Sequence, residues 1–228
     1  MPRLIAAIIR HGEYNQRHGV PSAHQPYGLT SAGEEQSRGA AAELMRLSLT
    51  ENAAIHPVID CSPLLRAWST ANIIADALFP KTKVESFDAL AERGLGAAAN
   101  LSIDEIARIV NEDPRYAPLP YNWKSDSHFR LPFLNAESLM ESGVRIADHL
   151  RKRMVGLRDS GDLIKVFVGH GAAFRHAAFH LGTLTIEDIA KLSMHHARPI
   201  LLQCDSGYSW RQVCGEWKLR EISEPHQD

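Results

Sequence analysis

The sequence predicts an α/β fold, a three-layer α/β/α sandwich around a mostly parallel central sheet. Two continuous apolar runs rich in branched residues, 4–9 and 163–168, are typical of strands buried on both faces of such a sheet. Helical stretches alternate with the short apolar runs, as in other α/β proteins. Both runs lead into a tripeptide of histidine and glycine, and the carboxyl ends of parallel strands meet at one edge. We expect one domain over residues 1–228.

Capping residues and helix breakers place the helices. The expected helices cover residues 30–47, 64–78, 101–111, 136–158 and 172–181, and Thr185 opens a further short one. Ser62 is expected to cap the second of them, with Pro63 in its first turn. Shorter strands are expected at 58–62 and 83–87, followed by a hairpin of 200–204 and 209–213 across Asp205-Ser206-Gly207.

The composition is that of an ordinary globular chain and excludes several classes of partner. Its 25 basic and 27 acidic residues leave a formal net charge of −2, a poor basis for general nucleic-acid binding. Cys61, Cys204 and Cys214 form neither a disulfide framework nor a zinc motif. The apolar run at 4–9 is too short for a signal peptide or a membrane span. We therefore expect a soluble cytoplasmic protein that binds neither nucleic acid nor membrane.

Residues 112–136 differ in composition from the rest of the chain. Their prolines and aromatic side chains predict an irregular, substrate-covering excursion from the domain rather than a linker. Aromatic faces beside cations would suit a phosphorylated ring, or a nucleotide-like or sugar-like group. The alternative is that the aromatic residues only pack the excursion onto the domain. The candidates to face a pocket are Tyr121, Trp123, Lys124, His128 and Arg130.

His11 and His170 are the first candidate site residues. Arg10-His11-Gly12 directly follows the first buried strand, whereas the second copy of this tripeptide, Arg17-His18-Gly19, lies in a polar loop. Gly169-His170-Gly171 follows the later strand, and its glycines leave the backbone free to approach a ligand. The helix after it would point its amino terminus, which attracts anions, at the same place. Taken alone, each histidine could equally be structural.

Arg66 and Glu92 complete the candidate set. Arg66 lies in the first turn of the helix after Ser62-Pro63, where it can reach the same edge of the sheet. Together with Arg10 it would offer two planar guanidinium forks that suit phosphate oxygens. Glu92 lies in a glycine-rich loop and is a candidate general acid. Taken alone, each of these residues would more often be a solvated surface side chain.

Together these pieces resemble the histidine phosphatase superfamily, also called the phosphoglycerate mutase-like family. The resemblance extends from the first strand to the His170 loop, with the motifs in the family's order and at its usual separations. The motifs are Arg-His-Gly (Arg10, His11, Gly12), Leu-Thr-x-x-Gly (Leu29, Thr30, Gly33), Ser-Pro-x-x-Arg-Ala (Ser62, Pro63, Arg66, Ala67), Glu-Arg-x-x-Gly (Glu92, Arg93, Gly96) and Gly-His-Gly (Gly169, His170, Gly171).

The resemblance implies a metal-independent phosphatase that forms a phosphohistidine intermediate and uses no cofactor. His11 would be the nucleophile, and Glu92 would protonate the leaving oxygen and then activate water. Arg10, Arg66 and His170 would hold the phosphoryl oxygens. The expected substrate is a small-molecule phosphate monoester. The residues implied to bind it are Gly12, Asn15, Arg17, Arg93 and Gly171.

The sequence departs from the mutases of this family. Arg17 stands where asparagine is usual, with Asn15 two positions earlier, and Leu95 replaces a frequent tyrosine. A paired arginine of the middle excursion is also missing. These departures remove groups that grip a carboxylated three-carbon substrate, which favours a phosphatase over a phosphoglycerate mutase-type phosphoryl transferase. A non-catalytic phosphate-binding module and a protein-phosphohistidine phosphatase are further alternatives.

Other features give weaker hypotheses. His176 and His180 have metal-ligand spacing on a helix, but no third ligand is evident, so packed or solvated histidines are expected and no metal site is predicted. His195 or His196 is a candidate for the rim of the pocket. The hairpin of residues 200–213 could form a sheet edge that pairs with a second subunit, which would make a homodimer.

Overall fold

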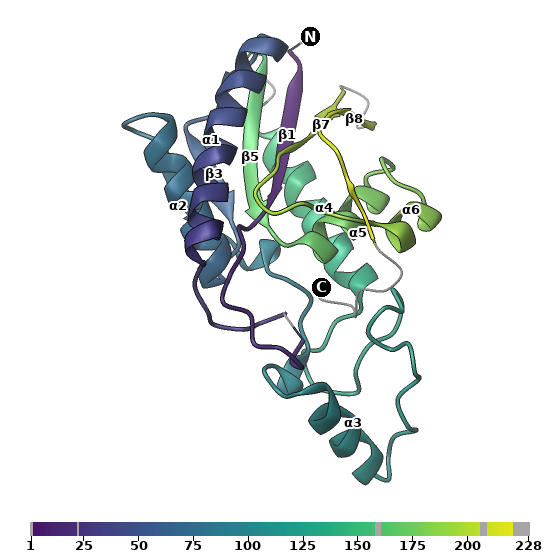
Figure 1. Cartoon of the computed structure of the whole chain (residues 1–228). Coiled ribbons are helices and arrows are strands. Elements are labelled where there is room, and N and C mark those ends of the chain that lie inside the picture. The colour runs from purple at the N-terminus through teal and green to yellow at the C-terminus, as the bar shows by residue number, and fades with distance from the viewer. Residues whose placement is uncertain (1, 22, 158–160, 206–208, 221–228) are drawn as a thin grey trace.

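Figure 1 shows the computed structural model, which describes residues 2–21, 23–157, 161–205 and 209–220. A sheet of seven strands in these residues forms the middle layer, with helices on both faces. The predicted three-layer α/β/α sandwich is therefore confirmed. In Figure 1 the irregular part of the chain around α3 (Ile103–Glu112) projects from one end of this sandwich.

The sheet is mostly parallel, as predicted. Its strands are β1 (Leu4–Arg10), β2 (Ala54–Ile55), β3 (Val58–Cys61), β4 (Lys83–Ser86), β5 (Leu163–Gly169), β7 (Ile200–Cys204) and β8 (Trp210–Cys214). Their order is β4-β3-β5-β1-β7-β8, with β2 beside β5. The first five strands pair in parallel, whereas β7 runs antiparallel to β1 and β8. A separate small sheet pairs β6 (Leu192–Ser193) with β9 (Lys218–Leu219).

The helices bury both faces of the sheet. α1 (Ser31–Glu51) and α2 (Leu65–Leu78) cover one face, and α4 (Leu139–Val155) and α5 (Gly171–His180) cover the other. Successive side chains of a strand point to opposite faces, so β1 contributes to both cores. Its side chains under α1 and α2 are Ile5, Ala7 and Ile9, and those under α4 and α5 are Leu4, Ala6 and Ile8.

Several predicted helix starts are confirmed. The Thr30 hydroxyl caps α1 by accepting a hydrogen bond from the Gly33 N–H at 3.0 Å. Ser102 forms a capping box at the start of α3, and Thr185 forms one at the start of α6 (Ile186–Lys191). The hairpin of β7 and β8 is also confirmed. Ser206 and Gly207 of its predicted turn lie outside the described residues, as does Arg158.

Two helix starts differ from the prediction. α4 begins at Leu139 rather than near 136, because Ser138 supplies its capping box. The predicted cap of α2 is wrong, since the N-cap position is Leu64 and carries no side-chain cap. The Ser62 hydroxyl accepts a long hydrogen bond of 3.3 Å from the Leu64 N–H. It also forms a shorter hydrogen bond of 2.8 Å with the His170 ring. Ser62 therefore lies two residues before the N-cap position, and its hydroxyl also bonds a residue that follows β5.

The chain between α3 and α4 is irregular. Residues 113–138 contain no helix or strand beyond the isolated bridge between Leu95 and Ala136. A third apolar cluster lies beneath this segment and includes buried Trp123, while Tyr121 is fully exposed. The segment is thereby packed onto its own core, separate from the two cores of the sheet. The buried members of that cluster are Ala23, Leu95, Ala98, Ile106, Trp123, Leu131 and Ala136.

A buried ion cluster ties β3 to β5 and α4. The Asp60 carboxylate is fully buried and contacts Lys165 Nζ at 2.5 Å and Arg153 Nε at 2.7 Å. His149 Nε2 lies 3.0 Å from the same carboxylate. Burial alone would raise the pKa of Asp60, but His149 and Lys165 hold it below its ordinary value. The paired carboxylate allows a lysine to lie within a central strand without leaving a buried charge uncompensated.

Close backbone contacts at two glycines hold the chain after β1 against the first turn of α1. A Cβ atom on Gly12 would collide with the Gly33 carbonyl, and one on Gly33 would collide with the Glu13 backbone. The Gly12 N–H also donates to the Thr70 hydroxyl at 3.0 Å. Because Gly12 follows His11 directly, these contacts set the position from which His11 projects.

We expect Gly33→Ala to destabilise the protein by about 1–3 kcal/mol, since the added methyl group overpacks a backbone contact. Gly39→Ala in the same helix is the matched control, because no atom lies within 4 Å of its Cβ position. Alanine there should stabilise the exposed helix by up to about 1 kcal/mol. Urea unfolding of both variants measures these changes. Equal stability of the two variants would contradict the proposed backbone contact.

Candidate active site

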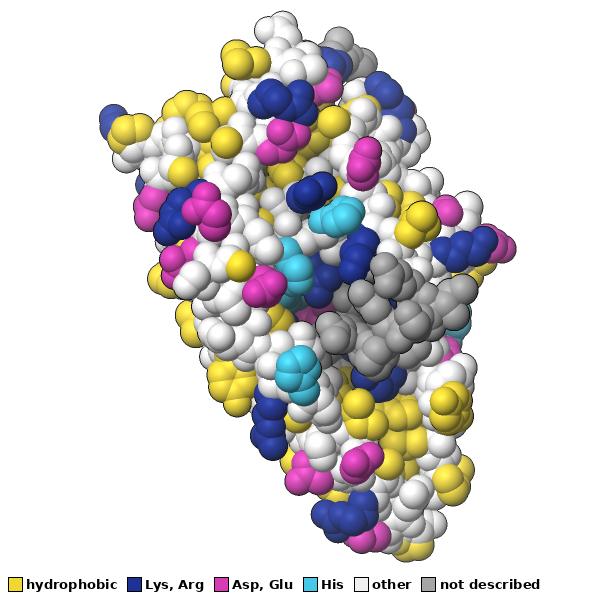
Figure 2. All heavy atoms as spheres, viewed as in Figure 1, with side chains coloured by type: hydrophobic (Ala, Val, Ile, Leu, Met, Phe, Trp, Pro, Cys, Tyr) yellow, Lys and Arg dark blue, Asp and Glu magenta, His cyan; other side chains and the backbone are white. Residues whose placement is uncertain are grey.

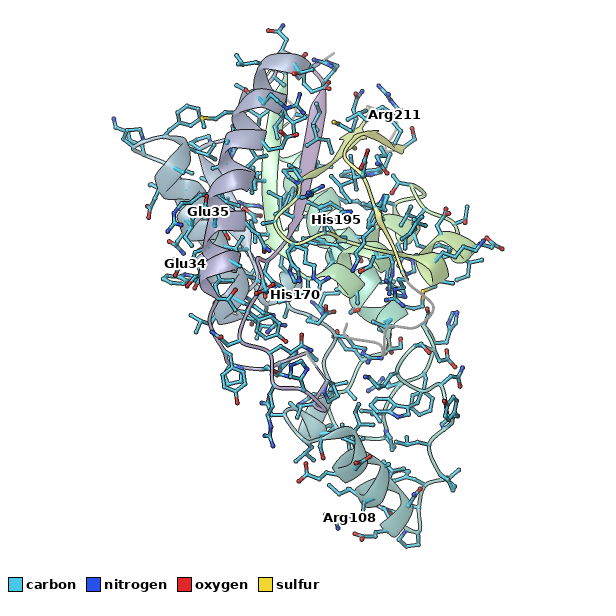
Figure 3. All side chains as sticks on the ribbon, viewed as in Figure 1. Glu34, Glu35, Arg108, His170, His195 and Arg211 are labelled. Carbon is cyan, nitrogen blue, oxygen red and sulfur yellow. The ribbon has the colours of Figure 1, made fainter. Side chains whose placement is uncertain are left out.

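The parallel pairing of β1 with β5 brings His11 and His170 together. Arg10 pairs with Gly169 at the ends of the two strands, and the His11 N–H donates to the Gly169 carbonyl at 2.9 Å. The ring centroids of His11 and His170 lie 5.2 Å apart. Figure 3 shows His170 just beyond the carboxyl ends of these strands. Two motifs separated by more than 150 residues therefore form one site.

The hydrogen bonds of His11 define its tautomer. The ring is 3 % exposed, and its Nδ1 lies 2.7 Å from the Gly12 carbonyl. A carbonyl only accepts, so Nδ1 carries the proton and Nε2 has a lone pair. Arg66 Nε donates to this Nε2 at 3.1 Å. The nitrogen that is free to act as a nucleophile thus faces the guanidinium of Arg66.

Arg66 is held in place by the loop before α1. It lies in the first turn of α2, as predicted, and is 1 % exposed. Its Nη1 donates to the Gln25 carbonyl at 3.0 Å and its Nη2 to the Ala23 carbonyl at 2.8 Å. The guanidinium also lies over the Tyr14 ring, 4.7 Å from the centroid. Burial lowers the pKa of Arg66, and nearby Glu92 acts in the opposite direction.

His170 is oriented by Arg66 and Ser62. Arg66 Nη2 lies 3.2 Å from His170 Nδ1. Because arginine only donates, Nδ1 accepts, and the proton on Nε2 is donated to the Ser62 hydroxyl at 2.8 Å. Arg66 therefore bonds both ring systems and fixes their relative orientation.

Burial and cationic neighbours favour the neutral form of both histidines. Burial is the main cause that lowers the pKa of His11 well below its ordinary value, and the charge of Arg66 adds to it. The pKa of His170 is lowered well below its ordinary value for the same two reasons. A neutral His11 keeps the Nε2 lone pair that nucleophilic attack requires.

Arg10 crosses the start of α5. Its Nη1 donates to the Met194 carbonyl at 3.1 Å. A Cβ atom on Gly171 would lie 3.1 Å from Arg10 Cδ, so glycine permits this close crossing. Figure 2 shows histidine, lysine and arginine side chains gathered near the middle of this face. The edge of the sheet is therefore suited to an anion.

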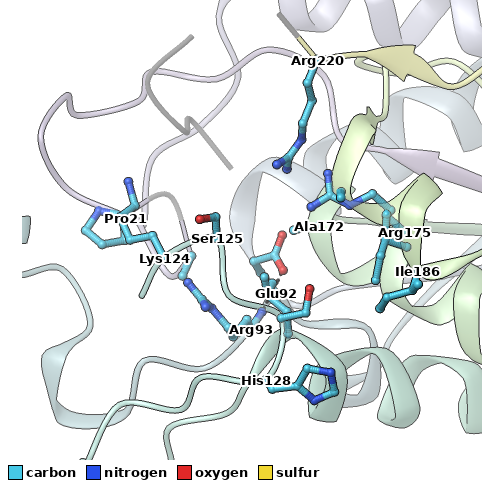
Figure 4. Close-up of a pocket in the computed structure, with 15 residues that line it drawn as sticks. Pro21, Glu92, Arg93, Lys124, Ser125, His128, Ala172, Arg175, Ile186 and Arg220 are labelled. Atoms are coloured by element: carbon cyan, nitrogen blue, oxygen red, sulfur yellow. Dashed lines mark hydrogen bonds between the residues drawn. The ribbon is translucent and has the colours of Figure 1, made fainter. Parts of the chain in front are cut away.

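Glu92 and Arg93 line a cavity of about 490 Å³ beside this cluster (Figure 4). Both side chains are 6 % exposed, and the Glu92 carboxylate accepts a hydrogen bond from the Arg93 N–H at 2.9 Å. The irregular segment, α5 and α6 supply most of the other lining residues. They include Ala23, Lys124, Ser125, Ser127, His128, Ala172, Arg175, Ile186, Ile189 and Arg220.

The structure separates the predicted substrate contacts into two groups. Arg93 lines the cavity, and Gly12 and Gly171 lie beside the histidines. The exposed Asn15 instead donates to the carbonyls of Gly28 and Leu29, so it organises the loop. Arg17 is exposed as well, and neither Asn15 nor Arg17 is among the described residues that line the cavity.

The aromatic excursion is divided in the same way. Lys124 and His128 line the cavity. Trp123 is buried in the third core, and Tyr121 is fully exposed. Arg130 pairs with Glu141 at 3.3 Å on the surface. The aromatic rings therefore mainly pack the segment, while its polar side chains face the cavity.

Sequence reasoning missed the specific roles of Gln25 and His196. The buried Gln25 side chain donates to the carbonyls of Arg17 and Val20, which shapes the loop whose carbonyls hold Arg66. His196 Nδ1 lies 2.9 Å from the His11 carbonyl, and the two rings are 5.5 Å apart. His196 reaches the site because β7 is antiparallel to β1, so the residues before β7 lie at the end of β1. The sequence offered only its position as a signal.

The described part of the chain provides no group of three or more histidine, cysteine or acidic side chains that could hold a metal ion. His176 instead bonds the Ala172 carbonyl and the Ser127 hydroxyl, and His180 contacts the Met140 carbonyl. Among the same residues, none of the helices combines the length and apolar character needed to cross a bilayer.

Comparisons with solved structures show the same fold over nearly the whole chain. A mycobacterial glucosyl-3-phosphoglycerate phosphatase is 20 % identical, with a TM-score of 0.65, and the match covers 92 % of this chain and 96 % of that one. The α-ribazole phosphatase of Shigella flexneri is 19 % identical, with a TM-score of 0.68 and coverages of 92 % and 94 %. At these identities the likeness concerns the fold. No curated protein sequence matches the chain.

A family model gives the assignment. The model of the histidine phosphatase superfamily (branch 1) matches residues 6–214. This match includes the Arg10–Gly12 tripeptide, Arg66, Glu92 and the His170 loop. The chain belongs to the histidine phosphatase superfamily.

Proposed function

We propose that the protein is a metal-independent phosphatase that hydrolyses a small phosphate monoester through a phosphohistidine on His11. The observation that carries this proposal is the neutral, buried His11 ring, whose Nε2 lone pair faces Arg66. A nucleophile that is deprotonated among fixed cations suits attack on an anionic phosphoryl group.

In the first step, the Nε2 lone pair of His11 forms a bond to phosphorus and the ester P–O bond breaks. In the structure that lone pair accepts a hydrogen bond from Arg66 Nε–H. Substrate binding must break this hydrogen bond, and the Nε–H then donates to a phosphoryl oxygen instead. Arg10 and His170 complete the anion site. The phosphate dianion favours protonation of His170, because an opposite charge raises the pKa of a histidine.

Glu92 serves as the acid and then as the base. It gives a proton to the leaving oxygen as the P–O bond breaks, and it takes a proton from the water that attacks the phosphohistidine. The N–P bond then breaks, which releases inorganic phosphate and restores neutral His11. Glu92 is buried and lines the cavity, and one of its oxygens accepts from the Arg93 N–H, which supports this role.

Hydrolysis is favoured over phosphoryl transfer between phosphoglycerates. Arg17 and Asn15, which stand near the position where the mutases carry a substrate-binding asparagine, lie outside the cavity lining. The structural neighbours compared above are named phosphatases. A mutase is the second candidate, and exchange of phosphate between 2- and 3-phosphoglycerate separates the two.

Replacement of His11 by alanine should abolish turnover, because it removes the Nε2 lone pair that would attack phosphorus. The measurement is phosphate release with chelator present, from nitrophenyl phosphate, phosphoglycerates, sugar phosphates and nucleotides. The wild type should form an acid-labile phosphoenzyme in rapid-quench experiments, and His11→Ala should not. Turnover by a clean preparation of His11→Ala would rule out this mechanism.

Glu92→Gln should reduce turnover in a way that depends on the leaving group. General acid catalysis contributes about 10²–10⁴-fold when the leaving oxygen is basic. We therefore expect a loss in that range for alkyl phosphates and a much smaller loss for nitrophenyl phosphate, whose leaving group needs little protonation. Steady-state kcat/KM for both ester types tests this. An equal loss for both would assign Glu92 a role other than that of the acid.

The protein should lose stability as the pH falls below about 6.5. Unfolded histidines bind protons near that pH, whereas the pKa values of His11 and His170 in the folded protein are well below it, and that of His176 is about 3. The unfolded state thus binds more protons, which removes about 1.4 kcal/mol per ring for each pH unit until the folded-state pKa is reached. Urea unfolding at pH 7.5, 6.5 and 5.5 measures the slope.

Ring NMR signals provide the direct check of this prediction. The His11 ring signal, assigned by its absence in His11→Asn, should not move between pH 7.5 and 5.5. A midpoint near 6.5 for this signal would contradict the neutral ring on which the proposed mechanism depends.

A further inference from the structure

We infer that Gln25 is a positioning residue for the reaction, because its side chain closes the loop whose carbonyls hold the Arg66 guanidinium. The inference rests on the proposed function, in which the Nε–H of Arg66 moves from His11 to a phosphoryl oxygen. Gln25 is assigned no contact with the reacting atoms. It acts only by fixing the position of Arg66.

The Gln25 side chain lies in the interior of the loop between β1 and α1, where it is 1 % exposed. Its Oε1 accepts a hydrogen bond from the Arg17 N–H at 2.8 Å. Its Nε2 donates to the carbonyls of Arg17, Val20 and Pro21 at 3.1, 3.2 and 3.3 Å. Both ends of this buried amide are therefore bonded to the main chain of the same loop, which is how a buried amide is satisfied. These bonds close the loop on itself.

The closed loop carries two of the carbonyls that bond Arg66. The Gln25 carbonyl accepts from Arg66 Nη1 at 3.0 Å, and the Ala23 carbonyl accepts from Arg66 Nη2 at 2.8 Å. Gln25 thus bonds the interior of the loop through its side chain and the guanidinium through its main chain. The Ala23 side chain is buried in the third apolar core, which anchors this part of the loop to the domain.

The position of Arg66 matters because the same guanidinium bonds both histidine rings. Its Nε donates to His11 Nε2 at 3.1 Å, and its Nη2 lies 3.2 Å from His170 Nδ1. A guanidinium is planar and rigid, so a shift of the loop carbonyls would displace its donors from both rings at once. A misplacement of about 1 Å in a group that positions the reactants can cost on the order of 100-fold in rate. The geometry that Gln25 gives the loop therefore reaches the reacting nitrogen of His11.

The first test compares Gln25→Met with the wild type in steady-state kinetics. Methionine is also unbranched and removes both ends of the amide. We expect kcat/KM to fall by about 10- to 100-fold. The loss should be equal for alkyl phosphates and nitrophenyl phosphate, since Arg66 would hold the phosphoryl group that both esters share. A loss confined to alkyl phosphates would assign the effect to Glu92, whose carbonyl lies 3.3 Å from His24 Nε2, and would overturn the inference.

A double-mutant cycle tests whether Gln25 acts through Arg66. In the Arg66→Ala background, Gln25→Met should change kcat/KM by less than about twofold, because the group that Gln25 positions is absent. Equal losses in the two backgrounds would give Gln25 a role independent of Arg66 and would overturn the inference.

Gln16→Met is the matched control. Gln16 belongs to the same loop, and the described part of the chain gives its side chain no hydrogen bond. This variant should retain the kcat/KM of the wild type. If Gln25→Met does not fold, Gln25→Ala replaces it, because alanine leaves space for water at the same carbonyls. Urea unfolding shows that each variant is folded under the assay conditions.

The Nε2 nitrogen of His11 provides a measurement that needs no turnover. This nitrogen accepts from Arg66, so its NMR signal should shift in Gln25→Met and remain at the wild-type position in Gln16→Met. That result supports the inference even when no ester is hydrolysed, an outcome that contradicts the proposed function alone. An unchanged His11 Nε2 signal in Gln25→Met would overturn the inference, whatever the protein hydrolyses.

Discussion

The parallel register of β1 and β5 is the constraint on which the site depends. Pairing of Arg10 with Gly169 ends both strands at the same level, and the His11 N–H completes the ladder at the Gly169 carbonyl. A slip of one residue would turn the side chains of β1 to the opposite cores. Since both faces of β1 are buried by helices, apolar packing opposes such a slip. The same packing that stabilises the sheet therefore aligns the two histidines.

Arg66 fixes the orientation of the two aligned histidine rings through hydrogen bonds. Its guanidinium is held by the carbonyls of Ala23 and Gln25, and it donates to the rings of His11 and His170. Both rings must then present an unprotonated nitrogen to it. Burial acts in the same direction by disfavouring a charged ring. The protein thus keeps the His11 ring neutral in a cationic environment, which is what the proposed attack on a phosphate ester requires.

The cavity has a different structural origin from the histidine pair. Its cations come from a loop, an irregular segment, α5 and the chain after β9, rather than from neighbouring strand ends. The third apolar core anchors the irregular segment and brings its polar residues to face α5. In the proposed function the sheet edge would hold the phosphoryl group, and the cavity would hold the rest of the substrate.

Local sequence signals predicted the sandwich, which the structure confirms, and five candidate site residues. Strand runs, capping residues and the motif order indicate Arg10, His11, Arg66, Glu92 and His170, and the structure brings the two arginines and the two histidines together. These signals act over a few residues, or over repeated strand-helix units, and are therefore readable along the chain. Contacts between distant segments are not. The antiparallel direction of β7 brings His196 to His11, and the Ser62 hydroxyl, which a local rule assigns to a helix cap, also bonds the distant His170 ring. Likewise, only packing decides that Arg175 and Arg220 line the same cavity as Arg93, because no sequence period relates a helix, a terminal strand and a loop.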